Sequence, residues 1–326
     1  MRMIGVDRRT VVAGAFAVGA APALAKAAGA LRDHDAMIPL WPGRPPGSPA
    51  TLPVEEIVER STDPALRDRA MTKIAQPRMA LFRPAKPNGA AVLITPGGGY
   101  SRVVIDKEGY QLAPLLADRG ITTFVLFYRL PADGWTTRPD APLADAQRAM
   151  RLVRHRATEF GIDPARVAAM GFSAGGHVCA DLAARFSAPV YAPVDAADRL
   201  PARPMLAAPI YPVVSMSLPN AHSGSRTNLL GDAPTAELER AHSPDRNVPA
   251  DAPPCFLVHA EDDETVPVAN SLLLRQALRD RGIPVDTHLF AQGGHGFGIR
   301  RIAGKPAAAW PDLYLSWAMS RGLFAA

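Results

Sequence analysis

From residue 79 onward, short apolar runs alternate with segments of helical periodicity, and this alternation restricts the possible folds more than any other feature of the sequence. The apolar runs, each short enough for one strand, lie at residues 90–95, 122–130, 166–172, 205–211, 255–260 and 286–291. Apolar residues recur with the helical period of about 3.6 in residues 107–119, 143–160, 174–187, 268–281 and 310–321. Strands that alternate with helices form a mainly parallel sheet with helices on both faces. The sequence therefore predicts an α/β fold.

The length and composition suit one large domain. The chain has 326 residues, of which 48% are hydrophobic, so it can bury a sizeable core. We assign residues 76–326 to a single α/β domain. Residues 26–75 contain the stretch "IPLWPGRPPGSP" and few periodic patterns, which predicts an extended N-terminal arm over the surface. Residues 213–253 are rich in Ser, Pro, His and Arg and break the alternation, which indicates an insertion over one edge of the sheet.

The first 25 residues have the features of an export signal. A basic stretch with the pair Arg8-Arg9 precedes an apolar run of Ala, Gly and Val, and the small-residue pattern Ala23-Leu24-Ala25 follows. This order predicts a signal peptide of the twin-arginine type at residues 1–25. An uncleaved membrane anchor is the alternative, but the run is shorter than the ~20 apolar residues of a membrane span. We therefore expect a periplasmic or secreted protein with no stable membrane span after signal cleavage.

The charge and the cysteines restrict the partners. The formal net charge is +5, and charges of opposite sign alternate along the helical segments, so we expect no nucleic-acid partner. No cofactor or metal motif is evident, and we expect neither group. Cys179 and Cys255 are the only cysteines and both lie in apolar surroundings. We expect two buried free thiols, with a disulfide between them as the alternative.

Residues with reactive side chains or flexible backbone follow several of the predicted strands. Gly97–Gly99 follow residues 90–95, Ser173 follows residues 166–172, Asp262 and Asp263 follow residues 255–260, and His295 follows residues 286–291. In an open parallel sheet, ligands bind beyond the carboxyl ends of the strands. The sequence therefore predicts that these groups meet in one site.

The segment Gly171-Phe172-Ser173-Ala174-Gly175 fits the Gly-x-Ser-x-Gly pattern of a nucleophile elbow. In such an elbow the serine occupies a strained turn between a strand and a helix, and its neighbours must be small. The helix that follows presents backbone N–H groups to the reacting oxygen. A serine that merely caps an ordinary helix is the alternative.

A reactive serine needs a base, and the base needs an acid that fixes its tautomer. The glycine-rich stretch "QGGHGFG" offers His295 as the base, and "AEDDETVP" offers Asp262 or Asp263 as the acid. The segment from Asp263 to Pro267 resembles the Asp-x-x-Val-Pro turn of many α/β-hydrolases, which favours Asp263 as the acid and leaves Asp262 to cap a loop. The chain order of serine, aspartate and histidine also matches that fold.

The stretch "TPGGGYS" follows a predicted strand and offers backbone donors for an oxyanion. It corresponds in position to the His-Gly-Gly-Gly loop of lipases and esterases, with Pro96 in place of the histidine. We assign the oxyanion hole to the N–H groups of Gly98, Gly99 and Ala174. A phosphate-binding loop is the alternative, but its glycine spacing and its Gly-Lys-Ser/Thr sequence are absent.

Together, these motifs and the segments "GIDPARVAAMGFSAGGHV", "NLLGDAP" and "PPCFLVHAEDDETVP" resemble α/β-hydrolases of the acetyl-xylan-esterase and feruloyl-esterase-like type, near the "xylanase B-like" esterases. The resemblance implies a serine carboxylesterase that removes small acyl groups, acetyl above all, from plant polysaccharide or its oligosaccharides. A feruloyl or general short-chain carboxylesterase, a serine peptidase and an inactive binding protein on the same fold are the alternatives. No pair of facing carboxylates for glycosidic cleavage is evident in the sequence.

Overall fold

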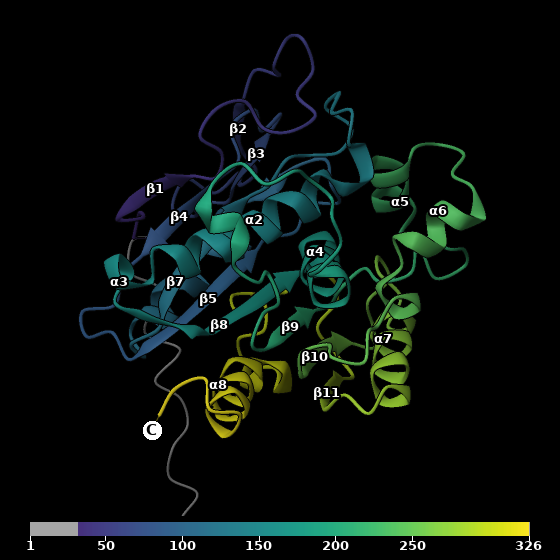
Figure 1. Cartoon of the computed structure of the whole chain (residues 1–326). Coiled ribbons are helices and arrows are strands. Elements are labelled where there is room, and N and C mark those ends of the chain that lie inside the picture. The colour runs from purple at the N-terminus through teal and green to yellow at the C-terminus, as the bar shows by residue number, and fades with distance from the viewer. Residues whose placement is uncertain (1–31, 326) are drawn as a thin grey trace, which may run out of the picture. The chain divides into compact units, whose positions relative to one another are not determined.

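The computed structural model describes residues 32–325, and the predicted signal peptide at residues 1–25 lies outside this part of the chain. The main sheet in residues 32–325 has the strand order β1-β4-β7-β5-β8-β9-β10-β11 (Figure 1). Its strands are β1 (Ala36–Pro39), β4 (Arg78–Phe82), β5 (Gly89–Thr95), β7 (Thr122–Phe127), β8 (Ile162–Phe172), β9 (Ala207–Ile210), β10 (Cys255–Ala260) and β11 (Val285–Phe290). The pairs β1–β4 and β4–β7 are antiparallel, and from β7 to β11 every pairing is parallel. The predicted mainly parallel sheet is confirmed.

Both faces of this sheet are covered. Every residue of β7 and β10 is buried, and because successive side chains of a strand point to opposite faces, both faces must be shielded from water. The helices are α1 (Leu112–Ala117), α2 (Ala141–His155), α3 (Ala157–Phe160), α4 (Ser173–Arg185), α5 (Ser223–Leu230), α6 (Ala236–Ala241), α7 (Ala269–Asp280) and α8 (Trp310–Ser320). Helices α2 and α4 pack on each other and on β8, whereas α7 and α8 contact β10 (Figure 1).

The helix predicted at residues 107–119 is divided. A buried π-helical turn, η2 (Asp106–Tyr110), precedes the short helix α1. The polar run from Asp106 to Glu108 has the composition of an exposed surface, yet all of η2 is buried. Burial of this run depends on partners that are distant in sequence, which the helical period cannot reveal.

The segment predicted as an arm is built into the domain from residue 36. Strand β1 pairs with β4 at the edge of the main sheet, and β2 (Glu56–Glu59) and β3 (Arg69–Thr72) form a small antiparallel sheet with β6 (Val103–Val104). These strands have four residues or fewer, too short for a visible alternation of apolar and polar residues.

A fully buried ion pair anchors this N-terminal segment. Arg129 and Asp145 have no exposed side-chain surface, and the Arg129 Nε lies 2.9 Å from the Asp145 Oδ2. The indole Nε1 of Trp41 donates to the Asp145 Oδ1 at 2.9 Å, and Arg129 also donates to the carbonyl oxygen of Pro46. Trp135 is also buried, and the guanidinium carbon of Arg129 lies 5.0 Å from the centre of its ring.

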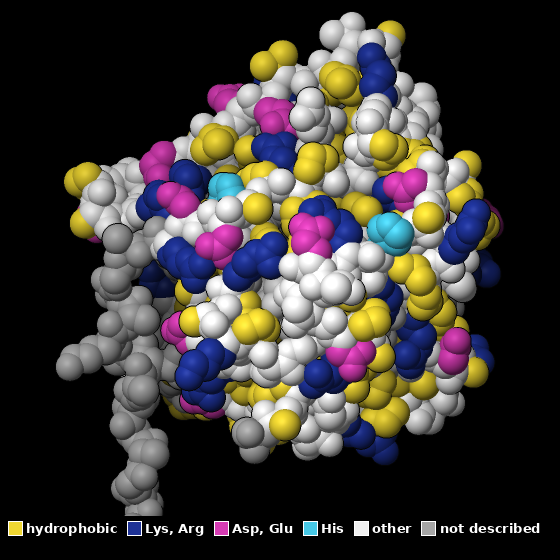
Figure 2. All heavy atoms as spheres, turned by 60° about the vertical axis from the view of Figure 1, so that its left-hand side comes forward, with side chains coloured by type: hydrophobic (Ala, Val, Ile, Leu, Met, Phe, Trp, Pro, Cys, Tyr) yellow, Lys and Arg dark blue, Asp and Glu magenta, His cyan; other side chains and the backbone are white. Residues whose placement is uncertain are grey.

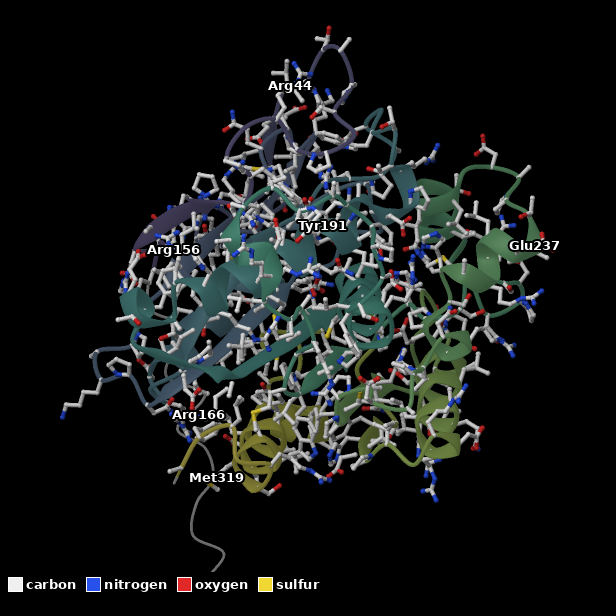
Figure 3. The ribbon with its side chains drawn as sticks, in the orientation of Figure 1. Arg44, Arg156, Arg166, Tyr191, Glu237 and Met319 are labelled. Atoms are coloured by element: carbon white, nitrogen blue, oxygen red, sulfur yellow. The ribbon has the colours of Figure 1, made fainter. Side chains whose placement is uncertain are left out.

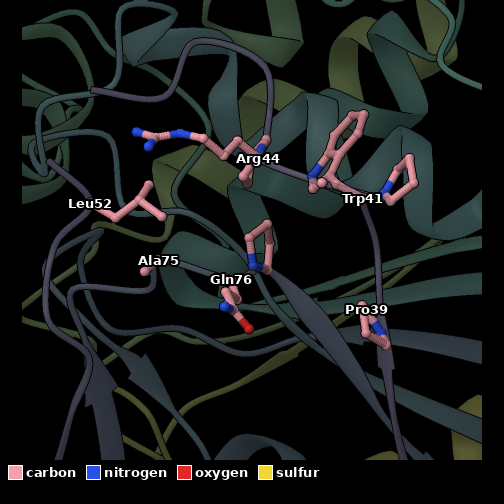
Figure 4. Close-up of a pocket in the computed structure, with 10 residues that line it drawn as sticks. Pro39, Trp41, Arg44, Leu52, Ala75 and Gln76 are labelled. Atoms are coloured by element: carbon pink, nitrogen blue, oxygen red, sulfur yellow. The ribbon is translucent and has the colours of Figure 1, made fainter. Parts of the chain in front are cut away.

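A pocket of about 270 Å³ lies within the same segment (Figure 4). Its lining includes Pro39, Trp41, Arg44, Leu52 and Gln76. None of the predicted site residues lines it, so this hollow is separate from the groups that carry the expected chemistry.

The insertion at residues 213–253 contains α5 and α6, and Glu237 marks the outer side of α6 (Figure 3). Asn228 of α5 donates from Nδ2 to the carbonyl oxygen of Gly99 at 2.8 Å, and Arg138 donates to the carbonyl oxygen of Thr227 at 2.9 Å. The insertion therefore covers the loop after β5, at the carboxyl ends of the strands, rather than an edge of the sheet as we expect from the sequence.

Lys and Arg side chains alternate with Asp and Glu on the face shown in Figure 2. Cys179 and Cys255 are buried free thiols, as predicted. Between residues 32 and 325, no helix is both long enough and apolar enough to span a bilayer.

Candidate active site

Ser173 lies at a strained turn between β8 and α4. Its φ of +55° belongs to the left-handed region, which a residue with a side chain rarely adopts. A Cβ at Gly171 would overlap the Thr95 hydroxyl, and a Cβ at Gly175 would overlap the carbonyl oxygens of Thr95 and Pro96. The backbone of the turn thus packs directly on the end of β5, and both positions require glycine.

The structure brings the three predicted triad residues together. Ser173 Oγ lies 2.8 Å from Nε2 of His295, and Nδ1 of His295 lies 2.7 Å from Oδ2 of Asp263. With the proton of the imidazole on Nδ1, His295 donates to the carboxylate and accepts from the serine hydroxyl. This arrangement allows the proton of the serine to move to His295 when Oγ attacks an electrophile.

The carboxylate of Asp263 is held by fixed donors. Its Oδ1 accepts from the N–H groups of Thr265 at 2.9 Å and Val266 at 2.8 Å. Burial alone would raise the pKa of the Asp263 carboxyl, but hydrogen bonds from His259, His295 and the Val266 N–H hold that pKa well below its usual range. Asp263 is therefore ionised at neutral pH and oriented toward His295.

His259 is a second histidine on this carboxylate, and no sequence pattern predicts this contact. It is fully buried on β10, and its Nε2 lies 3.0 Å from the Val266 carbonyl oxygen and 3.3 Å from Oδ2 of Asp263. Its Nδ1 lies 2.8 Å from the Ser271 hydroxyl. Since a carbonyl can only accept, Nε2 carries a proton, and His259 is a donor that orients Asp263.

Asp262 has the loop-capping contacts that the sequence predicts. Its Oδ1 accepts from the N–H groups of Gly293 at 2.8 Å and Gly294 at 2.7 Å. These two glycines begin the loop that carries His295. Asp262 therefore positions His295 through the backbone of its loop, whereas Asp263 contacts the His295 ring directly.

The predicted oxyanion donors lie in the loop that follows β5 and in the first turn of α4. Gly98 and Gly99 have φ values of +134° and +63°, and within residues 32–325 their N–H groups donate to no protein acceptor. Ala174 is in the first turn of α4, where backbone N–H groups have no acceptor within the helix. The neighbouring Gly97 lies against Cβ of Ser173 and donates its own N–H to Glu108. Three N–H groups thus remain for an oxyanion.

Glu108 and Tyr211 connect the oxyanion loop to the histidine loop, and sequence reasoning missed both. Oε2 of Glu108 accepts from the Gly97 N–H at 2.8 Å, and its Oε1 accepts from the Tyr211 hydroxyl at 3.0 Å. The same hydroxyl accepts from the Gly298 N–H at 3.1 Å, and the Tyr211 ring lies 5.4 Å from the ring of His295. Both side chains are buried, so this bridge is shielded from water.

The sequence profile of the BD-FAE family matches residues 79–278. The chain belongs to this family. Among solved structures, the acetyl ester-xyloside bifunctional hydrolase from Caldicellulosiruptor lactoaceticus is 32% identical, with a TM-score of 0.74, and the match covers 91% of this chain and 100% of that one. The carboxylesterase Cest-2923 from Lactobacillus plantarum is 24% identical, with a TM-score of 0.64, over 85% of this chain and 100% of that one. The expected α/β-hydrolase fold and the resemblance stated from the sequence are both confirmed.

Two curated relatives are longer proteins. Endo-1,4-beta-xylanase B of Butyrivibrio fibrisolvens is 36% identical over 213 residues, which cover 64% of this chain and 32% of that protein. Acetylxylan esterase of Xylanibacter ruminicola is 34% identical over 234 residues, which cover 68% of this chain and 44% of that protein. The chain thus matches less than half the length of either relative.

A neutral histidine on α4 supports the oxyanion loop of this BD-FAE domain. Nδ1 of His177 lies 2.6 Å from the Tyr100 hydroxyl, and its Nε2 lies 2.8 Å from the carbonyl oxygen of His242. Burial lowers the pKa of His177 to about 4, so it is neutral at pH 7. His177 thus holds Tyr100, which directly follows the oxyanion glycines. Within residues 32–325, no cluster of His, Cys, Asp or Glu is arranged to hold a metal ion.

Proposed function

We propose that the protein is a serine carboxylesterase that works through an acyl-enzyme. The observation that carries the proposal is the continuous hydrogen-bonded chain from Ser173 Oγ through His295 to Asp263, with contacts of 2.8 and 2.7 Å. We assign the oxyanion hole for the attack by this hydroxyl to the N–H groups of Gly98, Gly99 and Ala174.

In the first half of the reaction, Ser173 Oγ attacks the carbonyl carbon of the ester while Nε2 of His295 takes the hydroxyl proton. The resulting oxyanion accepts hydrogen bonds from Gly98, Gly99 and Ala174. When this intermediate collapses, the C–O bond to the alcohol breaks, and His295 returns the proton to the departing alkoxide. Water, deprotonated by the same imidazole, then attacks the acyl carbon. The bond from this carbon to Ser173 Oγ breaks, His295 returns the proton to Oγ, and the carboxylic acid is released.

For the substrate, we propose acetyl esters of xylan or of soluble xylan fragments. The names of two similar proteins, acetylxylan esterase and acetyl ester-xyloside bifunctional hydrolase, support this choice. The covering insertion is also polar and not the apolar lid of a lipase. A feruloyl or general short-chain esterase is the alternative within the same chemistry, and an inactive binding protein would lack acetyl-ester turnover.

We expect no glycoside cleavage at this site. The two carboxylates beside the reacting groups, Asp263 and Glu108, are both buried and bonded to fixed donors. In retaining and inverting glycosidases, two carboxyl groups instead lie on either side of the scissile glycosidic bond.

The test is a substrate panel of acetylated xylan, acetylated xylo-oligosaccharides, feruloylated arabinoxylan, a chromogenic xyloside and aryl esters of increasing acyl length, with the released acids identified. A compact acyl pocket discriminates by roughly 1–3 kcal/mol per methylene, so kcat/KM for acetate should exceed that for butyrate by at least about tenfold. Octanoate as the best acyl group, or no acetate from xylo-oligosaccharides while aryl acetates react, would overturn the substrate proposal and leave a general esterase.

We also propose that residues 1–25 export the protein to the periplasm or the medium. The pair Arg8-Arg9 before an apolar run supports this location. Fractionation of cells that express the full chain or an Arg8→Lys/Arg9→Lys variant tests it: export should require the arginine pair, and equal export of both chains would contradict a twin-arginine route.

A further inference from the structure

His222 is an N-cap residue whose tautomer is fixed by the backbone. It precedes α5 in the insertion, and its Nδ1 accepts from the Ser225 N–H at 3.1 Å. A backbone N–H can only donate, so Nδ1 of the neutral ring must be the acceptor and Nε2 must carry the proton. Because Nδ1 accepts from the first turn of α5, the Nε2–H of His222 is available as a hydrogen-bond donor.

The ring of His222 lies beside the oxyanion loop. A Cβ at Gly99 would stand 3.9 Å from Cε1 of His222. Helix α5 is held in this position because Asn228 donates to the Gly99 carbonyl oxygen and Arg138 donates to the carbonyl oxygen of Thr227. Burial, and then the positive charge that His295 can carry, lower the pKa of His222, so the neutral form of this ring predominates at pH 7.

The Nε2–H of His222 donates to no protein acceptor within residues 32–325. An acetyl ester has few oxygens that could accept from it. The carbonyl oxygen accepts from the oxyanion donors, and the ester oxygen accepts from His295 as the alcohol leaves. The methyl group has no acceptor. A further acceptor must therefore belong to the alcohol.

We propose that Nε2 of His222 donates a hydrogen bond to an oxygen of the alcohol part of the ester, a hydroxyl or ring oxygen next to the acylated carbon of a sugar. This inference rests on the proposed esterase function and deepens it, since it names polyhydroxy alcohols as the leaving groups that the site prefers. His222 then determines specificity, and esters without a neighbouring oxygen leave its donor unpaired.

Two substitutions separate this role from helix capping. Asn is a good N-cap residue, so His222→Asn keeps an acceptor for the Ser225 N–H and removes the Nε2 donor. Gln reaches further, and the amide nitrogen in His222→Gln can occupy the place of Nε2. His155→Asn, on the exposed end of α2, is the matched control for the same change of residue type.

The experiment measures kcat/KM for acetylated xylo-oligosaccharides and for the pair 2-hydroxycyclohexyl acetate and cyclohexyl acetate, which differ by one neighbouring hydroxyl. We expect His222→Asn to lose about tenfold or more on the hydroxylated esters, in line with one lost hydrogen bond, and clearly less on cyclohexyl acetate. His222→Gln should recover part of the loss, and His155→Asn should match the wild type on all three.

Equal losses on hydroxylated and plain esters, no loss at all, or a His222→Gln variant as impaired as His222→Asn would each overturn the assignment of the donor. A wild-type enzyme that hydrolyses cyclohexyl acetate but neither hydroxylated ester would overturn it as well, and the esterase proposal would stand. Failure of the wild type on every acetate would instead overturn the esterase proposal, and the role of His222 with it.

Discussion

Asp145 and Asp263 are both buried carboxylates that accept from a nitrogen-bearing ring and from a backbone N–H, but the two hydrogen-bond networks end differently. Around Asp145, the partners Arg129 and Trp41 are buried donors that cannot move away without leaving a charge unpaired. Around Asp263, the network passes through His295 to the hydroxyl of Ser173, whose backbone is strained. Burial and pairing alone therefore do not identify a catalytic carboxylate. A network that ends at a reactive atom on a strained turn does.

The largest expected effect is at the reactive end of the Asp263 network. Ser173→Ala or His295→Ala should lower kcat by about six orders of magnitude, and the double variant should be little worse, because triad residues act as a unit. Aryl acetate hydrolysis measures the loss, and urea unfolding checks that the fold is intact. Near-normal turnover in a folded Ser173→Ala variant would remove Ser173 from the mechanism.

The next effect separates the two adjacent aspartates. Asp263→Asn should cost about four orders of magnitude in kcat, because an amide favours the wrong tautomer of His295. In Asp262→Asn the amide oxygen can still accept from Gly293 and Gly294, so we expect a loss of about tenfold or less. The reverse ranking of the two variants in the same assay would make Asp262 the acid.

The Asp145 network should show the opposite pattern, a loss of stability without a comparable loss of activity. Asp145→Ala leaves the buried charge of Arg129 unpaired and should lower the free energy of unfolding by about 3–5 kcal/mol. Asp145→Asn keeps one acceptor and provides a milder variant if the alanine chain does not fold. A large fall in kcat per folded molecule, measured well below the unfolding midpoint, would show that this network reaches the active site.

A smaller effect is expected at the bridge between the two loops of the site. Tyr211→Phe removes the hydroxyl that joins Glu108 to Gly298 and should lower kcat about tenfold with little change in KM, because small displacements of catalytic loops slow the reaction. Tyr314→Phe is the control, since the buried hydroxyl of Tyr314 has no hydrogen-bond partner within residues 32–325. If both variants behave alike, the bridge does not position the loops.

The smallest expected effect is a pH dependence of stability from His177. Its pKa of about 4 is below the 6.5 of an exposed histidine, so between these values the unfolded chain binds the extra proton and stability falls as pH falls. Between pH 7 and pH 5.5 this amounts to about 1 kcal/mol. Urea unfolding at both pH values should show a smaller difference for His177→Gln than for the wild type, and an equal difference would assign the effect to other groups.

The sequence predicts the long elements and the triad geometry for the same reason. Buried strands such as β10 are continuous apolar runs in the sequence. The turns that carry Ser173 and His295 need glycines, and these can be read directly from the sequence. Strands β1 to β3 are too short to show a period. Glu108, Tyr211 and His259 are ordinary residues in the sequence and gain their roles only from partners that are distant along the chain. Tertiary pairing of this kind leaves no local pattern.

The hydrogen bond from Asn228 to the carbonyl oxygen of Gly99 also limits how the enzyme can be re-engineered. Residues 213–253 form an insertion, so their exchange with the corresponding segment of a relative would be expected to leave the rest of the domain unchanged. Because Asn228 of this segment donates to the oxyanion loop, a chimaera that lacks an amide at position 228 would have a changed kcat for every ester. Its preference among esters would not be the only property to change. An exchange of substrate selectivity between members of this fold therefore requires that the exchanged segment keep the hydrogen bond to the Gly99 carbonyl oxygen.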